Sequence, residues 1–164
     1  GIQSGSIFHH FKTKEALGVA AADYWAETTA LFFASAPYHQ FDDPLERVLG
    51  YIDFRRDILQ GDIAEFTCLV GTMVQATYQS NPAISDACRA SIFNHAATLE
   101  ADIAEAMKQY NISGNWTPKS LALHTQAVLQ GGFILAKASG DVALAKDSTA
   151  HLRRYIELLF QANS

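Results

Sequence analysis

Hydrogen-bonding side chains and lysines gather near the start of the chain, in a stretch that predicts a short helix followed by a longer one. It runs GSIFHHFKTKEAL from Gly5 to Leu17. Ile7 and Phe11 are four residues apart, so they share one helix face, which we expect to turn toward a small core. The polar side chains then face outward. Such groups on a short helix, followed by lysines, are typical of a helix that contacts the DNA major groove.

A second helix is predicted to begin at Lys14, because the Thr13 hydroxyl can accept a backbone N–H of its first turn. The alternative interpretation of the whole stretch is an ordinary packed helical turn. In that case His9 and His10 are merely exposed and have no DNA to contact.

The same stretch resembles the recognition helix and following helix of the TetR family of bacterial transcriptional regulators. The family pattern is a small residue or Gly, Ser or Thr, an aliphatic residue, Tyr, two variable residues with His common, Phe, a polar link, and Lys-Glu-x-Leu. The matching positions are Gly5, Ser6, Ile7, Phe8, His9, His10, Phe11, Lys14, Glu15 and Leu17. Phe8 departs from the pattern, because the usual Tyr contacts a DNA phosphate through its hydroxyl.

The resemblance implies a ligand-responsive DNA-binding transcriptional regulator, expected to be a repressor that a small-molecule effector releases. It implies two recognition helices on a palindromic operator, about 34–36 Å apart. The family has two more helices ahead of this point, so the chain resembles one whose DNA-binding domain lacks its front half. The predicted DNA-contacting residues are Gln3, Ser4, Ser6, Phe8, His9 and Lys14.

Composition and charge agree with a helical protein that contacts DNA at one end only. The 164 residues suffice for one compact domain plus a remnant of another, and the formal charge is −5. Residues 1–14 contain Lys12 and Lys14 but no acid, a basic tip on an acidic body. Cys68 and Cys88 make neither a disulfide framework nor a metal quartet, so we expect reduced thiols and a cytoplasmic protein. No segment reads as a signal peptide or membrane span.

Prolines and glycines divide the rest of the chain into helices. Three prolines follow capping residues, at Asp43-Pro44, Asn81-Pro82 and Thr117-Pro118, where a missing N–H costs nothing. The predicted helices are 14–35, 44–60, 63–79, 82–110, 118–139 and 147–162. The fold class is therefore all-α. We expect a partial helix-turn-helix domain over residues 1–20 and an effector-binding and dimerisation domain over residues 21–164.

The last two predicted helices carry more apolar surface than one subunit can cover. Residues 120–136 contain no charge, and a helix that is apolar all round must be buried all round. The pair also resembles the last two helices of many TetR-family proteins, which form a four-helix dimer interface. We therefore predict a homodimer in which the helices of the two copies approach closely at Gly132. The predicted interface residues are Leu129, Gly132, Phe133, Ala136, Tyr155, Leu159 and Phe160.

No catalytic or metal-binding constellation is present in the sequence, so we expect no enzymatic activity, no metal and no cofactor. Polar residues within apolar stretches are instead candidate contacts for an apolar or aromatic effector: Thr72, Gln75, His95 and His124. The alternative is that each bonds neighbouring backbone. Cys68 is either a reactive thiol at a helix start or a buried inert one. Two rival functions are a helical enzyme or ligand carrier without DNA binding, and a pure interaction bundle.

Overall fold

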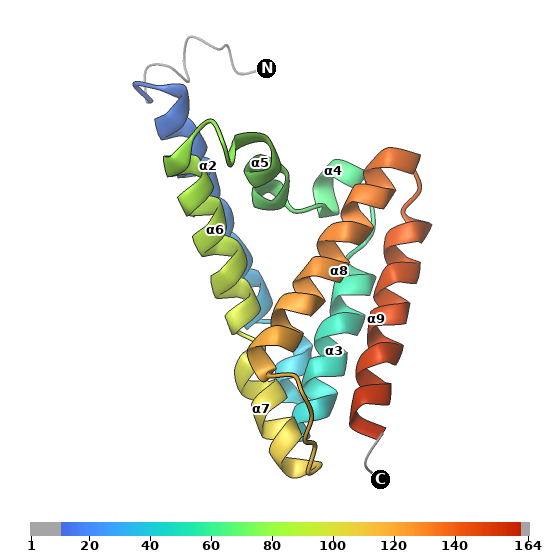
Figure 1. The fold of residues 1–164 in the computed structure, drawn as a ribbon. Helices are drawn as coiled ribbons and strands as arrows, with labels where there is room; N and C mark the ends of the chain where they lie inside the picture. Colours follow the sequence, from blue (N-terminus) through green and yellow to red (C-terminus); the bar gives the residue numbers. More distant parts are fainter. Residues whose placement is uncertain (1–10, 162–164) are drawn as a thin grey trace. The chain divides into compact units, whose positions relative to one another are not determined.

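The protein is described by a computed structural model that covers residues 11–161 of the chain, and its ordered elements are all helical within that range (Figure 1). The all-α prediction is therefore confirmed. The elements are α2 (Lys14–Ala34), the 3₁₀ helix η1 (Pro37–Gln40), α3 (Pro44–Asp57), α4 (Ile63–Phe66), α5 (Leu69–Thr77), α6 (Pro82–Ala97), α7 (Glu100–Gln109), α8 (Pro118–Ser139) and α9 (Ala143–Gln161).

All four predicted helix caps are present. The Thr13 hydroxyl accepts the N–H of Ala16 at 3.0 Å, and the Asn81 side chain accepts the N–H of Ile84 at 3.1 Å. Asp43 and Thr117 cap α3 and α8 in the same way. Each cap satisfies backbone donors that have no partner within the helix, which is why the chain begins these helices where the sequence predicts.

Two predicted helices are each divided in two. The predicted helix 63–79 stops at Thr67, which adopts an extended backbone (φ −83°, ψ 153°), and resumes as α5. The predicted helix 82–110 turns at Thr98, whose hydroxyl donates to the carbonyl of His95 at 2.8 Å. There the backbone bonds tighten from the i−4 to the i−3 carbonyl, as Leu99 N–H donates to Ala96 O. Such local bonding competes with the helical ladder and breaks it.

The last helix begins four residues earlier than predicted. The Asp141 carboxylate accepts the N–H of Ala143 at 2.8 Å, so it supplies a start signal directly after the Gly140 turn. Gly140 ends α8 with φ +73°, a left-handed conformation that glycine adopts without strain. The connection between α8 and α9 is therefore short, and the two helices pack together.

The chain forms two compact units. The first contains residues up to Phe33 together with Leu69–Phe93. In it, α2 and α6 approach at Gly18, where an added Cβ would lie 2.4 Å from the Ile84 Cδ1 atom.

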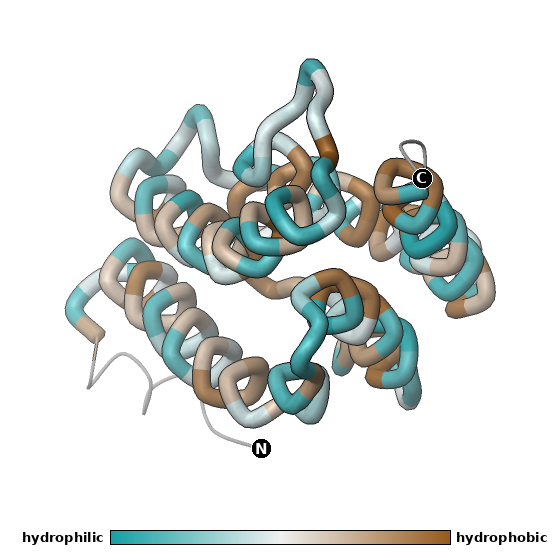
Figure 2. The backbone as a smooth tube through the Cα atoms, turned by 90° about the horizontal axis from the view of Figure 1, so that it is seen from below, coloured by the Kyte–Doolittle hydropathy of each residue, from teal (hydrophilic) through white to brown (hydrophobic). Residues whose placement is uncertain are grey.

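The second unit contains Ala34–Cys68 and Asn94–Ser164. Within it α3 contacts α7, α9 and η1, and α8 contacts both α7 and α9. Figure 2 shows brown apolar and teal polar residues along the same helices. The core includes Tyr51, Ile52, Ile103 and Ile156, none of which has measurable exposure.

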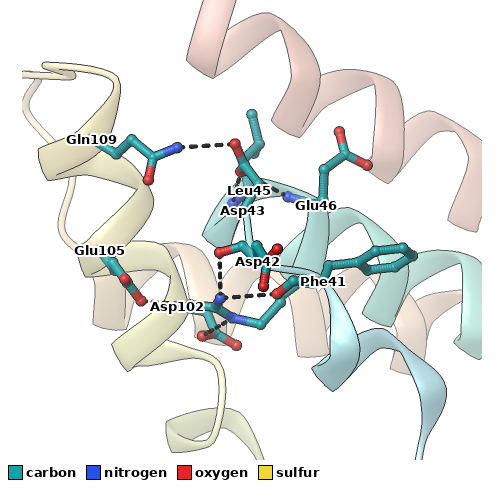
Figure 3. Close-up of polar contacts among 9 residues, drawn as sticks. Phe41, Asp42, Asp43, Leu45, Glu46, Asp102, Glu105 and Gln109 are labelled. Carbon is teal, nitrogen blue, oxygen red and sulfur yellow. Dashed lines mark hydrogen bonds and ion pairs between the residues drawn. The ribbon is translucent and has the colours of Figure 1, made fainter.

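Ion pairs from Arg47 join the start of α3 to α7 (Figure 3). Its guanidinium contacts the carboxylates of Asp102 at 2.7 Å and Glu105 at 2.5 Å. The same side chain donates to the carbonyls of Phe41 and Asp42, so one guanidinium fixes the loop ahead of α3 as well. The Arg47 side chain is mostly buried, so these ion pairs hold α3 and α7 in position more firmly than pairs between exposed side chains would.

Asp43 makes a second connection between the same two helices. While one of its oxygens caps α3, the other accepts from the Gln109 amide at 2.9 Å and the Tyr110 hydroxyl at 2.5 Å. Partial desolvation opposes the charged form, but these hydrogen bonds outweigh it and lower the pKa of the Asp43 carboxyl. The end of α7 is thereby tied to the start of α3, which fixes the base of the second unit.

Candidate effector and dimerisation sites

A chain of hydrogen bonds crosses the interior of the second unit. The Gln126 side-chain N–H on α8 donates to the Tyr51 hydroxyl on α3 at 2.9 Å. That hydroxyl lies 3.0 Å from Nε2 of His95, in the last turn of α6. Tyr51 is fully buried and Gln126 nearly so. Polar groups in such a place are costly unless they are bonded, so the three residues stabilise one another as a set.

The surroundings of His95 fix its charge state. Burial, then the positive charge of Arg55, lower the pKa of His95 from 6.5 to about 4. A neutral imidazole whose Nε2 carries no proton can accept the hydrogen bond of the Tyr51 hydroxyl, which itself accepts from Gln126. Burial also raises the pKa of Tyr51. Both groups are therefore neutral at pH 7.

Arg55 places a positive charge beside this network. It lies one helical turn after Tyr51 on α3, and its side chain is buried, with 8% of the residue exposed. Its guanidinium carbon is 5.4 Å from the centre of the Phe133 ring on α8, a cation–π distance. The Phe133 ring lies 6.5 Å from that of Phe66, and Phe66 and Cys68, both only partly buried, pack against the core cluster that contains Phe133. The partly exposed apolar side chains of Phe66 and Cys68 thus lie near the buried Arg55 and the hydrogen-bonded network.

The four predicted effector contacts are not equivalent in the structure. His95 is part of the buried network. His124 lies on the exposed side of α8, where its ring packs edge-on against Tyr155 of α9 at 5.2 Å. Thr72 and Gln75 belong to the first unit and are exposed on α5. Gln75 donates to the carbonyl of Gly71 on its own helix, which is the backbone-bonding alternative. A shared effector site for all four stays a prediction.

Tyr51 and Gln126 were missed as candidate polar contacts. Gln126 carried a signal, since it is one of few polar side chains between Ser120 and Ala136. Tyr51 carried a weaker one, because a tyrosine at helical spacing reads as ordinary core. Only the packing of α3 against α8 shows that its hydroxyl joins two other helices.

The outer side of α8 is apolar and exposed. Ile134 and Leu135 are 48% and 50% exposed, and neither is compensated by a nearby charge on the same stripe. The residues on that side recur at intervals of three and four: His124, Ala127, Val128, Gly131, Ile134, Leu135 and Ala138. A continuous apolar stripe of this length on a charged protein marks an interaction surface.

The outer side of α9 continues this surface. Leu144, Tyr155 and Leu158 are 38%, 44% and 57% exposed, and they share one side of the helix. The contact between His124 and Tyr155 joins this side of α9 to the stripe on α8. We call the joined exposed residues of the two helices the α8–α9 outer face.

Most of the residues predicted at the dimer interface lie inside the subunit. Five of the seven are buried by the chain's own packing: Leu129, Gly132, Phe133, Ala136 and Phe160. Tyr155 is exposed and Leu159 half-buried, so these two have surface for a partner. The uncharged sequence of α8 did not distinguish its two sides, because apolar residues occupy both. A dimer interface therefore stays a prediction, and the available surface is the α8–α9 outer face.

The two adjacent glycines of α8 differ in their surroundings. A Cβ on Gly132 would lie 3.4 Å from the Ala145 Cα atom and 3.4 Å from the Ser148 Cβ atom, both on α9. A Cβ on Gly131 would meet nothing within 4 Å. The close approach predicted at Gly132 is therefore an approach of α9 within the same subunit, and Gly131 is the glycine on the outer face.

The predicted DNA contacts fall mostly outside the described residues. Gln3, Ser4, Ser6, Phe8 and His9 all precede residue 11. Lys14 is described: it is the first residue of α2 and is exposed. Among residues 11–161, no cluster of His, Cys, Asp or Glu has the arrangement of a metal site, and no helix is long and apolar enough to cross a bilayer.

Comparison with known proteins bears on the fold. No protein-family model and no curated protein matches the chain. Among solved structures, a transcriptional regulator of the TetR family from Agrobacterium tumefaciens matches with a TM-score of 0.77. The match covers 94% of this chain and 80% of that one, at 22% sequence identity. The chain has the fold of a TetR-family regulator. The resemblance inferred from the amino-terminal residues is thus confirmed by an independent observation.

Proposed function

We propose that the protein is a homodimeric, ligand-responsive transcriptional regulator that binds DNA through its amino-terminal end. The observation that carries this proposal is the agreement of two separate signals. The residues from Gly5 to Leu17 resemble a TetR-family recognition helix, and the helices that follow have the fold of a regulator of that family. A chance match at the amino terminus would not select that fold. The expected action is repression that a small-molecule effector relieves.

The α8–α9 outer face supports the dimer. It exposes Ile134 and Leu135 on α8 and Leu158 on α9 together with small residues, and a monomer would leave this apolar surface in water. A second copy related by a two-fold axis covers the face with the same face, which gives an isologous four-helix contact. Two recognition helices then contact the two halves of a palindromic operator.

DNA binding is tested with Lys14→Ala in the full-length protein. An operator is first selected from a random duplex library, and affinity is then measured across a range of salt concentrations. Lys14 is exposed at the first turn of α2, beside the proposed recognition helix, so its ammonium should contact a phosphate. The variant should bind all sequences more weakly and lower the salt slope by about one unit. An unchanged slope would remove Lys14 from the interface.

The second candidate function is a helical small-molecule-binding protein or enzyme that does not bind DNA. The buried network of Tyr51, His95 and Gln126 favours it as much as it favours a regulator, because both need a polar site in the core. The duplex selection separates the two. Failure to enrich any sequence with the full-length protein would leave the ligand-binding function and exclude the regulator.

A further inference from the structure

Each helix of the α8–α9 outer face carries one exposed histidine among its apolar residues. His124 is exposed on α8, on the same stripe as Leu135, which follows it about three turns later. His151 is exposed on α9, one turn before Tyr155 and on the same side. Histidine is the side chain whose charge ordinarily changes between pH 5 and 8. The surface proposed for a second copy therefore contains groups that respond to acid.

The helix that carries His124 offers no carboxylate to a charged imidazole. Between Pro118 and Ser139, α8 contains no Asp or Glu, and its charged residues are Lys119 and Lys137. At 3.6 residues per turn, both lysines lie on a different side of the helix from His124. A positive charge on His124 would thus have no partner on α8.

The helices packed against α8 add little that would stabilise this charge. From α9, the Tyr155 ring lies edge-on to the His124 ring, with the centres 5.2 Å apart. From α3, Tyr51 meets the inner side of α8 at Gln126, which is the side opposite to His124. The charged residues of α7, which also contacts α8, are Glu100, Asp102, Glu105 and Lys108. Since Arg47 binds two of those three carboxylates, water is the main partner of a charged His124.

His151 differs, because it has a carboxylate close by on its own helix. Asp147 lies four residues before it, is exposed, and projects from the same side of α9. Arg154 lies three residues after it with the opposite charge. A charge on His151 therefore has a partner within reach, whereas a charge on His124 does not. The two histidines should respond differently when the face is covered.

A second copy on the α8–α9 outer face would remove His124 from water. The stripe on the partner's α8 is the same stripe, so it is apolar and brings no acid. Covering an imidazolium in this way costs much more free energy than covering a neutral imidazole. The dimer should therefore bind fewer protons than two separate subunits. Acid then favours the separate subunits, because they bind the additional protons.

We propose that His124 makes dimerisation sensitive to pH: the two copies associate while it is neutral and separate when it is protonated. The inference rests on the proposed function, since it takes the α8–α9 outer face as the dimer interface, and it adds a means of regulation. Each dimer contains two copies of His124, so acid acts twice on every dimer. Binding to a palindromic operator should weaken together with the dimer, because it needs two recognition helices.

Sedimentation equilibrium of the full chain, at about pH 7.5 and about pH 5.5, tests the inference. The dimer dissociation constant should be at least about tenfold larger at the lower pH, because each proton that dimerisation expels contributes up to tenfold per pH unit. Far-UV circular dichroism in the same buffers checks that the subunit stays folded. His95 is largely buried within the subunit itself, so dimerisation should not change its protonation.

His124→Gln is the matched variant, and His151→Gln is its control. Glutamine keeps a neutral hydrogen-bonding side chain but takes up no proton in this range. His124→Gln should dimerise equally well at both pH values, whereas His151→Gln should retain most of the pH dependence. If His124→Gln does not fold or dimerise, the imidazole NMR signals of His124 decide. They should change at a lower pH in the wild-type dimer than in a monomeric Leu135→Glu variant.

A dimer that is equally tight at both pH values, or tighter in acid, would overturn the inference and leave the proposed dimer intact. A pH dependence that persists in His124→Gln would overturn the role of His124. A wild-type chain that is monomeric at both pH values would instead refute the proposed dimer, and this inference with it.

Discussion

The two sides of α8 have similar residues but opposite surroundings. The inner side, with Gln126, Gly132 and Phe133, is covered by α3 and α9 of the same subunit. The outer side, with Gly131 and Leu135, is open. Adjacent glycines therefore have different roles: one lets α9 approach, and the other lies on the surface proposed for a second copy. An apolar sequence therefore shows how much surface must be buried, whereas the packing shows which partner buries it.

The largest expected effect comes from placing the same side chain on each glycine in turn. In Gly132→Leu, even the Cβ would be in van der Waals contact with Ala145, so the rest of the side chain overlaps α9. Overpacking of this kind should cost about 3 kcal/mol in the free energy of unfolding. Gly131→Leu should leave the subunit folded, with a gain of about 1 kcal/mol from helix propensity. Urea unfolding at several protein concentrations separates subunit stability from dimerisation.

Equal destabilisation of the two glycine variants, independent of concentration, would contradict the assignment of Gly131 to an open face. It would mean that both glycines pack within the subunit.

The free energy of unfolding should also depend on pH, because Gln126 on the inner side of α8 is joined through Tyr51 to His95, a titratable group. The pKa of His95 is lowered from 6.5 to about 4 in the folded protein. Between these values the unfolded chain binds a proton that the folded chain does not, so stability falls as pH falls from 6.5 toward 4. The full effect is about 3 kcal/mol. His95→Gln should remove this part of the pH dependence, as measured by denaturant unfolding across that range.

A wild-type stability that stays level from pH 6.5 to 4.5 would show that His95 is not held neutral by burial. Retention of the slope in His95→Gln would assign it to other groups.

The sequence predicted the helical content and the helix starts well because these depend on local signals. Asp43, Asn81 and Thr117 each precede a proline, and each caps its helix as expected. The breaks at Thr67 and Thr98 could not be read in the same way, because the lower helix propensity of a threonine is too small to end a helix by itself. The helix ends at Thr67 because the backbone there is extended, and at Thr98 the hydroxyl donates to a carbonyl of the preceding turn.

The candidate sites were less predictable, because they depend on which helices meet. His95 was identified as a polar residue in an apolar stretch, but its partner Tyr51 is 44 residues away in sequence. His124 has the same chemical character and lies instead on the outer face of α8. Helical spacing placed Phe133 and Gly132 on apolar stripes without showing that α9 of the same chain covers them.

The outer side is tested by introducing a charge. Leu135→Glu would place two carboxylates near each other across the proposed two-fold axis and remove them from water. The dimer dissociation constant should rise about 100-fold, which corresponds to about 2.7 kcal/mol. The control is Lys119→Glu, an exposed charge change on the same helix but off the stripe. Analytical ultracentrifugation measures both, and equal effects would argue against a specific contact at Leu135.

The smallest effect is expected at Gln126. Gln126→Leu keeps the volume of the buried side chain and removes one hydrogen bond to Tyr51, which can still donate to His95. The free energy of unfolding should change by about 1 kcal/mol or less. Thermal unfolding checks this. A much larger loss of stability would mean that the packing of α8 against α3 depends on Gln126, beyond the loss of one hydrogen bond.

Sedimentation equilibrium of the wild-type protein tests whether the α8–α9 outer face binds a second copy of the chain. The exposed Ile134 and Leu135 on α8 and Leu158 on α9 should be covered in solution, because burying apolar side chains is favourable. We predict a dimer at micromolar concentration that Leu135→Glu converts to a folded monomer. A wild-type chain that sediments as a monomer at that concentration would contradict the account.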